Sequence, residues 1–227
     1  MNINADLILT DAFIEARYTA THNLASHTLK AMLSSNVPNA KTTNLRASVT
    51  EIANGNGYTT GGVTLPVTSA TQVNGIFRLV MPSFPTWTAA GAGLTFKALE
   101  IYNDSAANDP IIGFLVHAVA GAKTITNMEV ASNVAILTCA DHGYSVGDEV
   151  VVTRLPAAVL NRTATITAVT TNTFRYAVTT ANITSQAVTT GRVVKPETIA
   201  LAAGQTYAVA TNTTTGVIVD TTQGVTT

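Results

Sequence analysis

The sequence predicts a mainly β protein, in which a β-sandwich or barrel host domain carries a short N-terminal helix and an inserted small all-β domain. Two observations predict this class. Apolar and polar residues alternate in most segments after the N-terminal region, and such alternation is typical of half-buried strands. Clusters of glycine, asparagine, aspartate and proline separate these segments and predict turns between them.

The N-terminal region has a helical pattern. In residues 5–16 apolar residues recur at three-to-four spacing, which predicts a helix with Asn4 or Asp6 as its N-cap. Residues 28–33 alternate instead, and we predict a strand there. Further strands of the host domain are predicted in the segments "GIFRLVMPSF", "LTFKALEIYN" and "PIIGFLVHAV".

A different sequence pattern in the middle of the chain predicts the inserted domain. There the strands are shorter, and turns recur at roughly the 8–12-residue spacing that is typical of a small sandwich or barrel. Longer alternating strands return afterwards. We therefore predict a discontinuous host domain over residues 1–122 and 196–227, and an inserted module over residues 123–195.

The composition excludes several classes of protein. No apolar run approaches the roughly 18 residues that a transmembrane helix needs. The net charge is −1 and no basic stripe is present, so we expect no nucleic-acid partner and no membrane. One cysteine in 227 residues excludes an intrachain disulfide framework. Only 11 % of residues are charged and about 40 are threonine, which favours surfaces that pack against other copies or partners.

The host domain resembles a family of tailed-bacteriophage virion proteins. Its segment over about residues 45–120 shows a Gly-Tyr-Thr-x-Gly-Gly turn, a Trp-Thr strand start and an Ala-x-x-Ile-Tyr-Asn strand, in that order. We expect the tyrosine of the turn and the tryptophan to cover one end of a small barrel or sandwich with their polar tips satisfied. The motif residues are Gly57, Tyr58, Gly61, Gly62, Trp87, Tyr102 and Asn103.

The predicted inserted module resembles small β modules of phage tail and surface proteins. The resemblance rests on the run "HGYSVGDEVVVTRL", followed by an Ile-Thr-Ala-Val strand and a Thr-Phe-x-Tyr strand. Gly143 and Gly147 are expected to bend the chain in this run, and Ser145 and Asp148 to bond local backbone. The modules of this kind are structural, so the resemblance implies no activity.

Three groups of residues raise the question of chemistry. Cys139, Asp141 and His142 lie within four positions, but residues so spaced around a strand end diverge, so we predict a turn rather than a catalytic site. The loop Asn103–Pro110 is rich in oxygen ligands but lacks the spacing of an EF-hand, and we predict a solvated hairpin loop rather than a calcium site.

The histidines do not predict a metal site. His22 and His27 lie five positions apart, which is the wrong spacing for one helical face, while His117 and His142 stand alone among apolar strands. We therefore expect no metal, no cofactor and no catalytic residue.

Together the two resemblances imply a non-enzymatic structural protein of a tailed-phage virion, made in the host cytoplasm. The first expectation is an accessory capsid protein that decorates or cements the head. Its partners would be the major capsid protein or other virion proteins and further copies of itself, for example in a trimer. One alternative is a tail, collar or fibre-adaptor protein. Another is a module that binds host glycans through Tyr144, Phe174 and Tyr176.

Overall fold

A computed structural model gives the fold of the chain. It is mainly β, with 42 % strand and 6 % helix, and this confirms the predicted fold class. The chain divides into two compact units, a host unit of residues 1–117 and 198–227 and an inserted unit of residues 118–197, close to the predicted bounds. The structure describes residues 2–3, 7–19, 21–73, 76–81, 83–118, 121–209 and 218–220.

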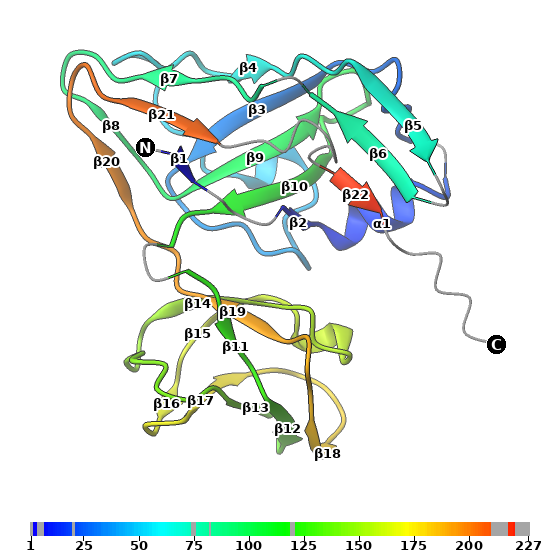
Figure 1. Cartoon of the computed structure of the whole chain (residues 1–227), viewed down its shortest axis with the longest axis vertical. Coiled ribbons are helices and arrows are strands. Elements are labelled where there is room, and N and C mark those ends of the chain that lie inside the picture. The colour runs from blue at the N-terminus through cyan, green and yellow to red at the C-terminus, as the bar shows by residue number, and fades with distance from the viewer. Residues whose placement is uncertain are drawn as a thin grey trace. The chain divides into compact units, whose positions relative to one another are not determined.

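The host unit contains one five-stranded sheet and several smaller ones (Figure 1). Its elements are β1 Asn2–Ile3, β2 Ile8–Leu9, α1 Asp11–Ala16, β3 Leu29–Ser34, the 3-10 helix η1 Arg46–Ser48, β4 Val63–Thr64, β5 Ser69–Val73, β6 Ile76–Val80, β7 Trp87–Thr88, β8 Leu94–Phe96, β9 Ala98–Asn103, β10 Ile111–Val116, β20 Ile199–Leu201, β21 Thr206–Val209 and β22 Ile218–Asp220.

The central sheet of the host unit has the strand order β2-β10-β9-β3-β4, and all its pairs are antiparallel. Every residue of β9 and β10 is buried, so both faces of these strands are covered. This explains why their sequences, "ALEIYN" and "IIGFLV", are nearly continuous apolar runs. The smaller sheets β1-β21-β7, β20-β8 and β22-β6-β5 contribute side chains to the same hydrophobic core.

The N-terminal helix is shorter than predicted. Residues 8–9 form strand β2 on the edge of the central sheet, and α1 begins only at Asp11. Thr10 caps α1, because its Oγ1 accepts a bond from the backbone N of Phe13 at 3.2 Å. Pairing with β10 therefore overrides the helical spacing, and the predicted helix over residues 5–16 is wrong in its first half. The suggested caps Asn4 and Asp6 lie outside the described residues.

The predicted strand over residues 28–33 is confirmed by β3, which pairs with β9 along its whole length. Leu29, Ala31 and Leu33 alternate with Lys30 and Met32 along β3. Four of these five side chains are fully buried, since the strand lies inside the sheet. The alternation in the sequence thus reflects the two-residue period of a strand, and not a sheet with one solvent-exposed face and one buried face.

The inserted unit is a two-sheet sandwich with its own core. Side chains such as Leu137 and Phe174 from one sheet and Val150 and Val193 from the other belong to one buried cluster. The sheets have the orders β11-β19-β14-β15 and β16-β17-β13-β12-β18. Their elements are β11 Lys123–Thr124, β12 Asn127–Ala131, β13 Val134–Thr138, β14 Glu149–Thr153, the 3-10 helix η2 Ala158–Leu160, β15 Thr163–Thr165, β16 Ala168–Val169, β17 Thr173–Ala177, β18 Ile183–Ala187 and β19 Arg192–Val194.

The two ends of the inserted unit meet. Its first strand, β11, pairs antiparallel with its last, β19, so that Lys123 lies opposite Val193 and Thr124 opposite Arg192. Because its two ends lie side by side, the inserted unit can take the place of a short loop in the host chain. Insertions at exposed hairpins are well tolerated.

Candidate functional site

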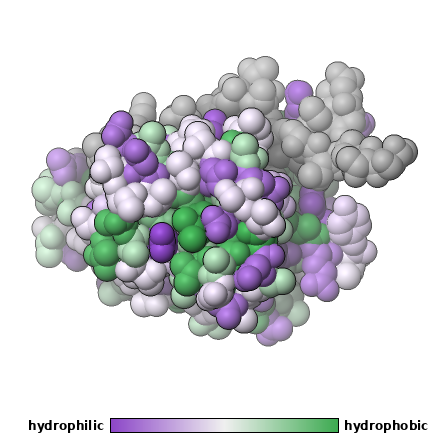
Figure 2. All heavy atoms as spheres, turned by 90° about the horizontal axis from the view of Figure 1, so that it is seen from below, coloured by the Kyte–Doolittle hydropathy of each residue, from purple (hydrophilic) through white to green (hydrophobic). Residues whose placement is uncertain are grey.

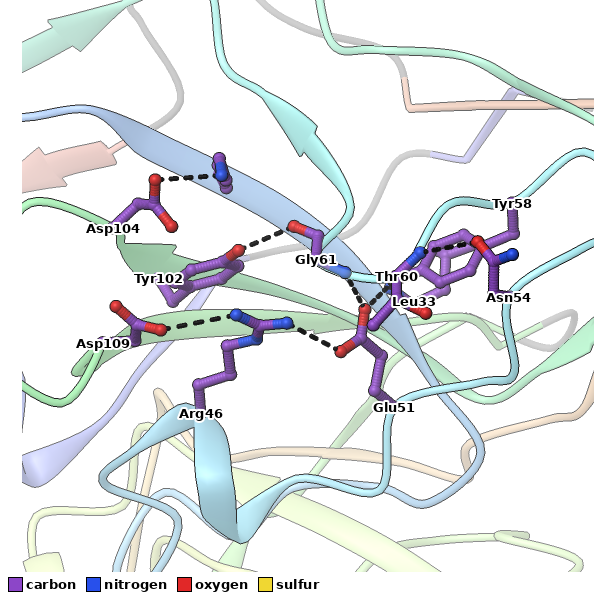
Figure 3. Close-up of polar contacts among 11 residues, drawn as sticks. Leu33, Arg46, Glu51, Asn54, Tyr58, Thr60, Gly61, Tyr102, Asp104 and Asp109 are labelled. Atoms are coloured by element: carbon purple, nitrogen blue, oxygen red, sulfur yellow. Dashed lines mark hydrogen bonds and ion pairs between the residues drawn. The ribbon is translucent and has the colours of Figure 1, made fainter.

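The residues of the Gly-Tyr-Thr-x-Gly-Gly turn form a polar network on the host unit with residues far away in the sequence (Figure 3). The carboxylate of Glu51 is its centre. Oε1 accepts bonds from the Tyr58 hydroxyl at 2.7 Å and from the backbone N of Gly61 at 2.5 Å. Oε2 accepts a bond from Nη2 of Arg46 at 3.1 Å. One carboxylate therefore holds both ends of the turn and a strand-connecting segment.

Arg46 connects this carboxylate to the β9–β10 loop. Its Nη1 lies 3.4 Å from Oδ2 of Asp109, and its guanidinium lies over the Tyr102 ring, 5.1 Å from the centroid. The Tyr102 hydroxyl donates in turn to the carbonyl oxygen of Gly61 at 2.6 Å. Burial alone would lower the pKa of Arg46, but its bonds and charge contacts, first with Glu51, raise it, so the ion pairs persist.

The glycines of the motif permit close backbone approach. Gly62 has φ +70°, and a Cβ there would lie 1.9 Å from the carbonyl oxygen of Ala31 on β3. A Cβ on Gly57, at φ +92°, would lie 2.0 Å from the carbonyl oxygen of Thr88 on β7. No side chain fits at either position. The turn therefore packs its backbone directly against two strands.

The arrangement offers neither a nucleophile nor a base. Burial, and next the hydrogen bond to Glu51, raise the pKa of Tyr58, so that its hydroxyl stays protonated. Burial raises the pKa of Tyr102 to about 12, although the Arg46 charge opposes this. Both oxygens of Glu51 already accept bonds from within the chain. The network can hold a turn rigidly against a sheet, and nothing in its geometry points to a reaction.

Trp87 is placed differently from the expectation. It is 2 % exposed and lies in the host core, where its ring packs against Tyr207 with the centroids 6.1 Å apart. Its Nε1 is buried and has no hydrogen-bond partner among the described residues. The expectation of a satisfied polar tip is thus wrong for Trp87, whereas it is confirmed for Tyr58, whose hydroxyl also accepts a bond from the backbone N of Leu33 at 3.2 Å.

Asn103 brings two histidines together, which the sequence spacing did not predict. Its Oδ1 accepts a bond from the backbone N of Ser105 at 3.1 Å, and this fixes the orientation of the amide. Nδ2 then donates to Nδ1 of His22 and to Nδ1 of His27, each at 2.9 Å. Burial, followed by the His27 charge, lowers the pKa of His22. The two rings therefore converge on one amide through a loop rather than through a helix face.

The oxygen-rich loop Asn103–Pro110 holds its carboxylates in ion pairs. Asp104 pairs with Lys30 at 2.9 Å, and Asp109 pairs with Arg46. Both carboxylates thus face cations of the chain itself, which disfavours a calcium ion between them. Within the described ranges, no group of three or more His, Cys, Asp or Glu residues is arranged to hold a metal.

A buried acid, Glu100, was missed by sequence reasoning. It lies in β9 and is 0 % exposed. Burial raises its pKa to about 8, although its bond to Ser34 opposes the shift. The Ser34 hydroxyl donates to Oε1 of Glu100 and also lies 2.7 Å from the carbonyl oxygen of Asn36. The raised pKa favours the neutral form of Glu100 at pH 7.

In the inserted unit, the Cys-Asp-His cluster forms a turn. Cys139 is 1 % exposed, and burial raises the pKa of its thiol. His142 uses both ring nitrogens within the fold, because Nδ1 accepts from the backbone N of Tyr144 at 2.9 Å and Nε2 lies 3.0 Å from the carbonyl oxygen of Thr173. Asp141 is exposed and has a positive φ. The prediction of a turn is confirmed.

Gly143, Gly147 and Asp148 of this run also follow the prediction. Gly143 and Gly147 have positive φ, and Asp148 accepts a bond from the backbone N of Ser145 at 2.9 Å. The carboxylate of Asp148 also pairs with Lys195 at 2.7 Å.

The three aromatic residues suggested as glycan contacts are buried, and this suggestion is wrong. Phe174 and Tyr176 are 0 % exposed, and Tyr144 is 9 % exposed. All three belong to the core of the inserted unit, where the rings of Tyr144 and Phe174 pack edge to face. The Tyr176 hydroxyl donates to the carbonyl oxygen of Leu160 at 2.8 Å. Alternation along β17 could have shown this, because both residues of that strand lie on its apolar face.

Comparisons with known proteins leave the site to be judged on its geometry. No family model, curated protein or solved structure matches the chain. Within the described part of the chain, the helices are all too short or too polar to cross a bilayer.

Proposed function

We propose that the protein is a non-enzymatic structural component of a tailed-phage virion, and specifically an accessory capsid protein that decorates or cements the head. The observation that carries the proposal is the closed network around Glu51. Tyr58, Gly61 and Tyr102 belong to the motif that resembles phage virion proteins, and their polar atoms bond within this network. Together with Arg46 and Asp109 they fix one rigid corner of the fold. A rigid corner of this kind suits a structural protein better than an active site.

The two-unit organisation supports the same role. The inserted unit has its own core and closes on its own ends through β11 and β19. The low proportion of charged residues, 11 %, leaves broad neutral faces for contacts with the coat or with other copies.

The proposal is tested with coat-protein shells that lack the chain. Purified protein is added to such shells and sedimented with them. We expect saturable binding in proportion to the number of coat subunits, and shells that resist heat or low salt better than bare shells. Absence of binding to intact shells, together with binding to isolated tails, would favour a tail, collar or fibre-adaptor protein instead.

A further inference from the structure

We propose that the outer face of the sheet β16-β17-β13-β12-β18 is a dimer interface, and that its partner is the same face of a second copy of this chain. The sheet is drawn at the lower edge of Figure 1, and Figure 2 views the molecule from that side. Hydrophobic residues gather across the middle of this view, with hydrophilic residues both between and beside them. A solvent-facing sheet surface is normally polar, so the partly exposed Val134 and Ile136 at the centre of this one indicate a contact.

The strand registers place the outward residues of this face in three rows. Inward residues such as Leu137 and Phe174 are fully buried, whereas their sequence neighbours point outward and are partly or fully exposed. One row is apolar, the middle row is mixed, and the third row is polar without charge. In the order β12, β13, β17 the rows are Ala131, Val134 and Ala177; Glu129, Ile136 and Arg175; and Asn127, Thr138 and Thr173.

The charges on this face complement each other across the middle row. Glu129 and Arg175 are the charged residues of the three rows, and they lie on opposite sides of Ile136. Their backbones are two strands apart, which is about 9–10 Å. Among the described residues neither side chain forms an ion pair. Each is therefore available to a partner.

One two-fold axis satisfies all three rows at once. If the axis lies between two facing copies and runs along β13, Glu129 of each copy faces Arg175 of the other. Ile136 then faces Ile136, and the apolar and polar rows face their equivalents. An axis perpendicular to the strands would instead place Glu129 against Glu129 and Val134 against Thr138. Both arrangements keep the strands of the two sheets nearly aligned, as in face-to-face sheet packing, so the pairing of the charges and of the rows favours the first.

The size of the face predicts a weak dimer. Strands of about 17 Å, spaced about 4.8 Å apart in five-stranded order, give on the order of 400 Å² per copy. A stable interface usually buries about 800 Å² per partner. We therefore expect a dissociation constant on the order of 10⁻⁴ M, which dense display of the chain on a surface would make effective.

The first experiment measures the association of the full chain by sedimentation equilibrium, from about 10 μM to about 0.5 mM, a range that brackets the expected constant. We expect a monomer–dimer equilibrium in which Ile136→Asp weakens association at least about tenfold, because it places two carboxylates against each other in an apolar contact. Val146→Asp is the matched control, since Val146 is 61 % exposed in a turn outside this face, and it should leave the equilibrium unchanged.

The second experiment tests the two-fold geometry itself by charge reversal. Glu129→Arg alone and Arg175→Glu alone should each weaken self-association, because like charges then face each other. A mixture of these two variants should regain association as a heterodimer, since each reversed charge then meets its opposite. Recovery on mixing also shows that both variants are folded.

Three results would overturn the proposal. They are a chain that stays monomeric over the whole range, association that Ile136→Asp leaves intact, and two charge variants that fail to associate when mixed although each gives the circular dichroism spectrum of the unchanged protein. Saturable binding of the face to a different protein, without self-association, would likewise replace the second copy as its occupant.

Discussion

At the scale of single residues, two acidic side chains define the host unit in opposite ways. Glu51 is partly exposed, and both its oxygens accept bonds, one of them in an ion pair with Arg46. Glu100 is fully buried, which raises its pKa, and its Oε2 has no partner among the described residues. The first carboxylate connects a turn, a loop and a strand. The second carboxyl group makes the stability of the fold depend on pH, because its ionisation inside the sheet is unfavourable.

Glu51→Gln should destabilise the host unit by about 2 kcal/mol, because a neutral amide loses the Arg46 ion pair and presents hydrogens to groups that are themselves donors. The free energy of unfolding from urea titration measures this change. Asp141→Asn is the control, since Asp141 is exposed, and it should change stability by less than about 0.5 kcal/mol. Equal effects of the two substitutions would contradict the role of the network.

Glu100→Gln should remove a pH dependence. The folded-state pKa of Glu100 is raised to about 8, above its ordinary value of 4.5. The stability that it contributes is therefore complete below pH 4.5 and is lost as the pH rises through 8. Between pH 5 and pH 8.5 the wild-type chain should lose on the order of 3 kcal/mol relative to Glu100→Gln. Parallel stability profiles of the two proteins would show that Glu100 does not carry this dependence.

At the scale of elements, the sequence predicted which segments form strands better than it predicted which distant segments lie beside them. Alternation identified β3, and glycines marked the turns, because strand period and backbone freedom are local properties. The helix over residues 5–16 was half wrong, since pairing of β2 with β10 is a long-range contact that overrides local spacing. Convergence of His22 and His27 on Asn103 was missed for the same reason, because a loop brings them together.

The polar network shows how much of the candidate site was within reach. Tyr58, Gly61 and Tyr102 were found through their motif, whereas Arg46 and Glu51 were not, because they lie outside it. The sequence did contain a signal, because charged residues are scarce in this chain and Arg46 and Glu51 lie close together just before the motif. The buried aromatic residues of β17 were misjudged because the apolar face of that strand was not assigned to a core.

Gly62→Ala tests the contact between the turn and β3. Gly204 provides a matched control in the same unit, with φ +85° against +70° and nothing within 4 Å of an added Cβ. Gly204→Ala should cost about 1 kcal/mol for its backbone conformation alone. Gly62→Ala should cost more than about 3 kcal/mol, because the Cβ also collides with the Ala31 carbonyl. Similar losses in thermal or urea unfolding would show that the turn can move away from β3.

At the scale of the whole molecule, the chain consists of two bodies with separate cores. The inserted unit closes on its own ends through β11 and β19, and its hairpin β12–β13 turns through Ser132 and Asn133, both at positive φ. Each unit therefore has the local turns and the buried side chains that an independent fold needs.

A fragment of residues 118–197 should accordingly fold alone. We expect dispersed amide signals in its NMR spectrum and one cooperative unfolding transition, because its core is formed entirely from its own side chains. As a control, the substitution Phe174→Ala should cost the fragment about 3 kcal/mol or more. A fragment that lacks dispersed signals would contradict the division into two units.

The location of the chain in purified particles, determined by cryo-electron microscopy, tests the proposed function most directly. Our account predicts density for the host unit at regular positions over the head, either one copy for each coat subunit or one trimer at each local three-fold axis. Density restricted to the tail vertex, in five-, six- or twelve-fold arrangement, would contradict decoration of the head. Absence of the chain from the particle would contradict the virion role altogether.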